Sequence, residues 1–186
     1  MKGLLNGLCN KVEIDGTEYE INTDFSVWIE IEHIIFAREH EDAVALAKIL
    51  ALAFPVLPAN PEKALERLFW FYSAGEETSK SEGTSAAKYD LVLDFDYVWG
   101  SFLAEFGIDL CKTKMHWWKF RALLLCLSES CRFSQIVGYR TMDLSHIKDK
   151  QKREFYERMK NRFRLPDRRT DEEKEQETAK KMERFF

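Results

Sequence analysis

Long hydrophobic runs are absent from this chain of 186 residues. The most apolar window, residues 43–57, contains Lys48 and Pro55 and is shorter than the roughly 20 apolar residues that a membrane-spanning helix needs. Residues 1–8 contain neither a long apolar segment nor a small-residue cleavage site, so we expect no signal peptide. These features argue against a membrane protein and favour the cytoplasm.

Cysteine and glycine are also sparse. The four cysteines are too few and too irregularly spaced for a disulfide framework in a chain of this length. The 8 glycines never gather into a phosphate-binding loop, and no nucleophile–base signature appears. We therefore expect no catalytic residue, no cofactor and no bound metal, and we predict that the protein is not an enzyme.

His116 and a group of aspartates are the polar residues that we consider as candidates for metal binding or acid–base catalysis. His116 has no second ligand-type residue at the close spacing of a metal site, so capping or hydrogen bonding is the favoured interpretation. Asp90, Asp94 and Asp96 form a small carboxylate cluster. We interpret them as exposed residues at the start of a helix, where negative charge suits the helix dipole.

Apolar residues recur at helical spacing along most of the chain, which predicts a mainly α protein. We expect a helical bundle-like domain with a small N-terminal β-hairpin. The hairpin is indicated by alternation over 12–14 and 19–21 around Asp15-Gly16, because glycine tolerates the positive φ of a tight turn. The predicted helices span residues 24–38, 42–53, 61–74, 94–106, 116–127, 133–139 and 146–165.

The run 116–127 is the most apolar of these predicted helices, and Trp117 and Trp118 stand at its start. Such a wide apolar arc favours a place in the middle of a helical core. Adjacent residues on a helix point about 100° apart, so one tryptophan is free to lie at a partner surface. At helical spacing one face of this run combines Trp117, Phe120, Leu124 and Leu127.

The segment 76–88 is small, polar and charged, without periodicity, which predicts a flexible linker. It separates residues 1–75, which hold the hairpin and three helices, from a helical part at 89–169. A charged tail, 170–186, follows. Whether the two main parts share one core is left open by the sequence.

Charge is unevenly distributed around the net value of −4. Residues 1–147 carry 14 Lys/Arg and 22 Asp/Glu, whereas residues 148–186 carry 14 and 10. The basic residues of the last predicted helix could follow nucleic-acid phosphates. Glu154, Glu157 and Asp167 interrupt them, which favours a solvated helix face or docking on an acidic protein surface.

Several separate motifs lie in the C-terminal half. They are Tyr89-Asp90, Asp94-Phe95-Asp96, Ser101-Phe102-Leu103, Gly107-Ile108-Asp109-Leu110, His116-Trp117-Trp118-Lys119-Phe120, Phe133-Ser134-Gln135-Ile136, Gly138-Tyr139-Arg140, Asp143-Leu144-Ser145, Ile147-Lys148-Asp149-Lys150, Phe155-Tyr156 and Leu165-Pro166-Asp167. Together they resemble the phage gene-product-fifteen family, from the tail-gene modules of siphophages and of prophages of Gram-positive bacteria. The N-terminal hairpin and helices look similar through weaker motifs.

Members of this family are encoded between the major tail protein and the tape-measure protein. This position implies a tail assembly chaperone, made in the cytoplasm of the bacterial host cell and absent from the mature virion. The implied partners are the tape-measure protein and the tail-tube protein, with self-association left open and no membrane or nucleic acid involved. The family has no catalytic residues to transfer to this chain.

Two other functional classes stay open, a minor structural tail protein of the virion and a nucleic-acid-binding phage regulator. The predicted contact surface combines aromatic side chains with the basic last helix and the tail. The residues predicted to bind a partner are Trp117, Trp118, Lys119, Arg153, Arg158, Arg162, Arg164, Phe185 and Phe186.

Overall fold

The computed structural model describes residues 7–37, 41–75 and 88–167. Within these ranges a two-stranded antiparallel sheet precedes seven helices, which confirms the predicted mainly α fold with an N-terminal hairpin. The predicted linker, except Lys88, and the tail 170–186 lie outside the described residues. The elements are β1 (Lys11–Ile14), β2 (Thr17–Glu20), α2 (Phe25–Ala37), α3 (Asp42–Ala53), α4 (Pro61–Tyr72), α5 (Phe95–Phe106), α6 (Trp117–Leu125), α7 (Arg132–Thr141) and α8 (Lys150–Arg162).

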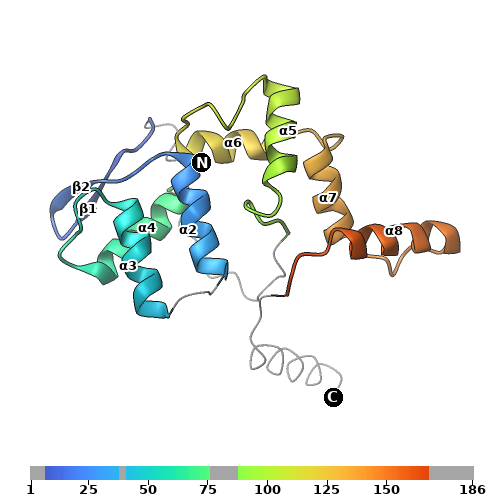
Figure 1. Cartoon of the computed structure of the whole chain (residues 1–186), viewed down its shortest axis with the longest axis horizontal. Coiled ribbons are helices and arrows are strands. Elements are labelled where there is room, and N and C mark those ends of the chain that lie inside the picture. The colour runs from blue at the N-terminus through green and yellow to red at the C-terminus, as the bar shows by residue number, and fades with distance from the viewer. Residues whose placement is uncertain (1–6, 38–40, 76–87, 168–186) are drawn as a thin grey trace, which may run out of the picture.

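The helices form an elongated body (Figure 1). The hairpin, α3 and α4 make up one end, and α2 packs against α3 on one side and α6 on the other. Helices α5 and α7 form the other part of the body, and α8 contacts α7 and projects away from the rest. The molecule is therefore more open at the α8 end than the predicted bundle.

The hairpin follows from its turn residues. Ile14 pairs directly with Thr17, so Asp15 and Gly16 form a two-residue loop. Both loop residues have positive φ, 52° and 76°, as a type I′ turn requires. Val12 and Ile14 are buried, and β1 contacts α4, so the predicted packing of the hairpin on the helices is confirmed.

The ends of α4 and α5 also follow from local sequence. The Asn60 side chain accepts a hydrogen bond from the Lys63 backbone N–H at 3.2 Å, and Pro61 occupies the first turn, where its missing N–H is harmless. Gly107 directly follows α5, with φ of 67°, and Gly75 lies three residues after α4, with φ of 74°. Glycine adopts this left-handed conformation without the steric cost that a Cβ atom brings.

Stacked aromatic rings connect the two halves of the chain. Trp28 of α2 stacks on Phe71 of α4 at 4.8 Å between ring centroids and on Trp117 of α6 at 6.2 Å. Phe120 of α6 lies 5.7 Å from Trp117 and 5.3 Å from Phe102 of α5. All five rings are buried in one hydrophobic core. The segments before and after the predicted linker therefore share a single core.

Helix α6 is shorter and less completely covered than predicted. It begins after His116, whose Nδ1 accepts a hydrogen bond from the Trp118 N–H at 3.0 Å, so the capping interpretation of this histidine is confirmed. Leu125 is 80% exposed, and Cys126 is exposed too. The last turn of α6 therefore lies at the edge of the core.

Helix α8 begins later than predicted. The sequence suggested a start at His146, but the helix starts at Lys150, after Asp149. The Asp149 carboxylate accepts a hydrogen bond from the Lys152 N–H at 3.0 Å, and aspartate is among the strongest N-caps.

The apolar stripe of α8 is also less buried than predicted. Phe155 is 42% exposed, whereas Phe163, just after the helix, is 8% exposed. Phe163 stacks on Tyr139 of α7 at 6.1 Å between ring centroids. Tyr139 also lies 6.5 Å from Phe155 and 6.3 Å from Tyr156 between ring centroids, so α8 contacts α7 through its middle as well as its end.

A buried ion pair fixes the start of α5 against α7. Asp94 is 1% exposed, and its carboxylate accepts hydrogen bonds from both terminal nitrogens of Arg140, at 2.6 and 2.8 Å. The Arg140 Nε also donates to the Phe163 carbonyl at the end of α8. The prediction that Asp94 is exposed is wrong, because its partner lies 46 residues away and leaves no local pattern.

We expect Arg140→Met to lower the free energy of unfolding by about 3–5 kcal/mol, because it leaves the Asp94 charge buried and unpaired. Urea denaturation measures this loss. The control is Lys11→Met, which breaks an exposed ion pair with Glu18 (3.2 Å) and should cost far less. Equal losses in the two variants would contradict the assignment.

Candidate interaction surfaces

The two tryptophans predicted to contact a partner are part of the core. Trp117 and Trp118 are 2% and 1% exposed, so the prediction that one of them lies at a partner surface is wrong. Their indole N–H groups are used inside the molecule. Trp117 Nε1 donates to the Tyr72 carbonyl at 2.9 Å, and Trp118 Nε1 donates to the Phe71 carbonyl at 2.7 Å.

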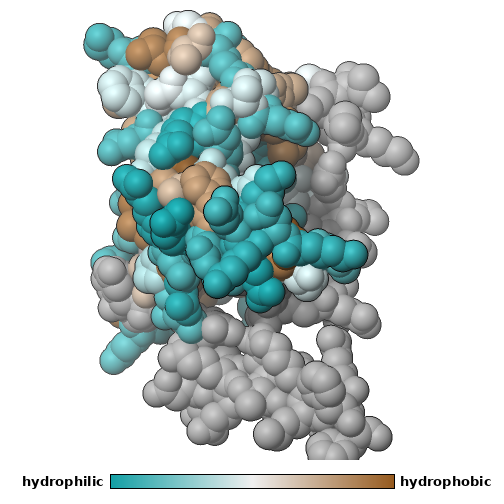
Figure 2. Space-filling model, turned by 90° about the vertical axis from the view of Figure 1, so that its right-hand side faces the viewer, coloured by the Kyte–Doolittle hydropathy of each residue, from teal (hydrophilic) through white to brown (hydrophobic). Residues whose placement is uncertain are grey.

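The other predicted residues divide between exposed cations and the tail. Phe185 and Phe186 lie outside the described residues. The end of the molecule that carries α8 shows a mainly hydrophilic surface (Figure 2). Part of its charge is balanced locally, since Arg153 lies 3.1 Å from the Glu157 carboxylate. The exposed cations are Lys119 on α6 and, on or just after α8, Arg153, Arg158, Arg162 and Arg164.

One apolar surface is exposed along α3 and the loop that follows it. Helix α3 buries one side in the core, through residues that include Ile49 and Leu50. On the other side Val44 is 45% exposed, and in the loop Val56 and Leu57 are 70% and 61% exposed. We call this the α3 surface, and its residues are Ala43, Val44, Ala47, Ala51, Val56 and Leu57.

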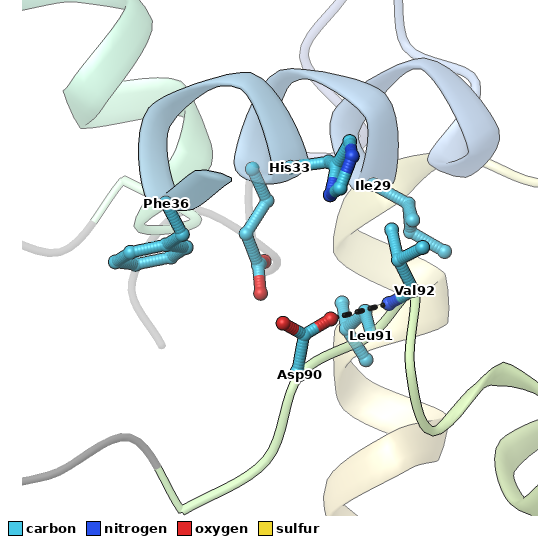
Figure 3. A pocket seen from close by; sticks show the side chains of 7 residues that line it. Ile29, His33, Phe36, Asp90, Leu91 and Val92 are labelled. Carbon is cyan, nitrogen blue, oxygen red and sulfur yellow. Dashed lines mark hydrogen bonds between the residues drawn. The ribbon is translucent and has the colours of Figure 1, made fainter. Parts of the chain in front are cut away.

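A second apolar surface lies between α2 and the turn before α5 (Figure 3). Phe36 of α2 is 48% exposed, and from the turn Tyr89, Val92 and Leu93 are 37%, 39% and 50% exposed. We call these four residues the turn surface. A small hollow beside them is lined by Ile29, Glu32, His33, Phe36, Asp90, Leu91 and Val92.

The turn is held by its own carboxylates. The Asp90 side chain accepts hydrogen bonds from the N–H groups of Val92 and Leu93, each at 2.9 Å. The Asp94 side chain accepts from the Asp90 N–H at 3.0 Å. Leu91 is buried and anchors the turn in the core, while its two apolar neighbours face outward. The exposed position of those neighbours is therefore built into the turn.

A buried acid lies at the edge of this hollow. Glu32 is 7% exposed and accepts a hydrogen bond from the Tyr72 hydroxyl at 2.8 Å, which joins α2 to α4. Burial raises the pKa of the Glu32 carboxyl; the Tyr72 hydrogen bond opposes this rise and the nearby Asp90 charge adds to it. Burial also raises the pKa of Tyr72 and of Tyr89. Burial thus opposes ionisation of this carboxyl and of the two hydroxyls.

Two absences hold for the described residues. In 7–37, 41–75 and 88–167, no three or more His, Cys, Asp or Glu side chains gather as metal ligands. No helix in those same ranges is long and apolar enough to cross a membrane.

The raised pKa of Glu32 predicts a pH-dependent stability. Its contribution is fully present below the ordinary carboxyl pKa of 4.5 and is lost as the pH rises through the raised value. Glu32→Gln removes this titration and keeps an acceptor for the Tyr72 hydroxyl. We expect the variant to gain free energy of unfolding relative to the wild type as the pH rises from 4 to 8, measured by urea denaturation.

The matched control is Glu30→Gln, on the exposed side of the same helix. Its difference from the wild type should stay nearly constant over the same pH range. A Glu32→Gln difference that is equally flat would contradict the raised pKa.

The model of the family described as Bacteriophage Gp15 protein matches residues 4–165, from before the hairpin to after α8. Searches of curated proteins and of solved structures returned no match. The family indicates a structural or assembly protein of a bacteriophage. The match agrees with the resemblance found in the sequence motifs, and the chain belongs to the bacteriophage Gp15 protein family.

Proposed function

We propose that this protein is a phage tail assembly chaperone. It binds the tape-measure protein, and with it tail-tube subunits, during assembly, and it carries out no chemical reaction. The observation that carries the proposal is the α3 surface. Family membership supports the phage context.

The composition of α3 explains why this surface needs a partner. In α3 only Asp42 and Lys48 are polar, and a helix that is apolar on nearly all sides is typical of a buried position. Here one side remains exposed, and Val56 and Leu57 extend the apolar character into the loop. Apolar surface of this kind marks a contact site for another chain.

The chemistry of a tape measure suits this surface. A long helix with an apolar stripe needs cover until the tube forms around it, and an apolar helix face binds such a stripe through residues three and four apart. Ala43, Ala47 and Ala51 recur every four residues on the exposed side of α3. Small side chains at a contact let two helices approach closely.

The basic residues of α8 have a secondary role in this proposal. They lie at the far end of the molecule from α3 (Figure 1), where the Arg153–Glu157 pair reduces the net positive charge. This arrangement favours a weak contact with an acidic protein surface over tracking of nucleic-acid phosphates.

Co-expression with the tape-measure protein of the same phage tests the α3 surface. We expect the wild type to keep the tape measure soluble and to copurify with it. The double variant V56D/L57D should lower the soluble tape measure severalfold, because charge at both sites opposes apolar contact. The control is Leu103→Asp on α5, at a leucine that is 44% exposed. Circular dichroism checks that both variants fold.

Two outcomes would overturn the proposal. In one, the tape measure is equally soluble without this chain and no complex copurifies. In the other, mass spectrometry finds the chain as a regular component of purified particles, which identifies a minor structural tail protein. A chaperone of the proposed kind is absent from the virion and stays in the host cytoplasm.

A further inference from the structure

The turn surface is not used by the proposed function. It brings together Phe36 from α2 and Tyr89, Val92 and Leu93 from the turn before α5, each between 37% and 50% exposed. Figure 3 shows Phe36 and Val92 on opposite sides of the hollow. Large apolar side chains that gather from distant parts of a chain mark a contact surface, whereas scattered ones do not.

The rim of this surface is acidic. Asp90 lines the hollow, and Asp96 is exposed on the first turn of α5. His33 also lines the hollow, and its buried Nδ1 makes no hydrogen bond among the described residues. A segment that combines aromatic side chains with positive charge matches both the apolar centre and the acidic rim.

The chain itself ends in such a segment. Residues 180–186 read Lys-Lys-Met-Glu-Arg-Phe-Phe and contain three basic and three large apolar side chains. Two phenylalanines at the very end supply the apolar anchors, and the lysines and arginine supply the charge. Residues 180–186 therefore combine the aromatic side chains and the positive charge that match the turn surface.

The C-terminal end of α8 lies near the turn that carries this surface. The Arg140 guanidinium contacts the Asp94 carboxylate, the Phe163 carbonyl and, at 3.4 Å, the Lys88 carbonyl. One side chain thus holds the end of α8 beside the residues that flank the turn. Figure 1 shows the segment after α8 leaving the helix at the end that lies against α7.

The tail is long enough to reach the turn surface. Nineteen residues follow Asp167 in the sequence. They span about 28 Å if helical and about 60 Å if extended. A tether of this length keeps the end of the chain at a high effective concentration near the surface, which favours its own tail over a second copy.

We propose that the turn surface binds residues 180–186 of the same chain, with Phe185 and Phe186 against Phe36, Val92 and Leu93. The tail then covers apolar surface that is otherwise exposed. This proposal does not depend on the proposed function, because it concerns contacts within one chain.

Photo-crosslinking in the full chain tests the contact. Phe186 is replaced by p-benzoylphenylalanine, which keeps an aromatic ring at that site. We expect crosslinks within one chain, mapped by mass spectrometry to residues 29–36 and 88–93. Leu93→Asp should lower their yield at least fivefold, and the control Leu103→Asp, at a leucine of similar exposure, should leave the yield within twofold.

Three results would overturn the proposal. The first is a crosslink yield that does not respond to Leu93→Asp. The second is crosslinking to other parts of the chain. The third is crosslinking only between chains, with a yield that rises with protein concentration, which would assign the surface to a second copy. No phage partner is present in this experiment, so its outcome is separate from that of the co-expression test.

Discussion

The rest of this structure depends on how side chains of α6 close the C-terminal end of α4. The last carbonyls of a helix have no partner within that helix. Here the Tyr72 carbonyl accepts two hydrogen bonds, from Trp117 Nε1 at 2.9 Å and from Arg121 Nη1 at 2.7 Å. The Phe71 carbonyl accepts a hydrogen bond from Trp118 Nε1. The donors lie 45–49 residues further along the chain, so these bonds lock its two halves together.

Both apolar surfaces are positioned by this junction. With α4 and α6 fixed, Trp28 fits between Phe71 and Trp117 and sets the position of α2. The Glu32–Tyr72 hydrogen bond then holds the second half of α2 against α4, where Phe36 meets the turn. Helix α3 packs on the same α2 and turns its other side outward. The core is thus complete, while the α3 surface and the turn surface remain outside it.

Elements governed by local chemistry were predictable from the sequence, and elements governed by distant partners were not. The Asp15-Gly16 turn, the bounds of α3 and the Asn60 cap all depend on residues within a few positions. The burial of Asp94 depends on an arginine 46 residues away. The turn surface was missed, although the run 91–93 offered a signal: three apolar residues directly before an aspartate cannot all face the core of a tight turn.

The junction at α4 also has a consequence for the order of events during synthesis. Residues 1–75 are synthesised before Trp117 and Arg121, so the Tyr72 carbonyl lacks both of these donors until then. We expect the hairpin and the first three helices to remain an incomplete intermediate during that time, because a loop of more than 40 residues has to close before the helix end is satisfied. Many proteins acquire their native state one domain at a time as they are translated. We expect this chain instead to complete both halves together, because the bonds that join them need residues from each.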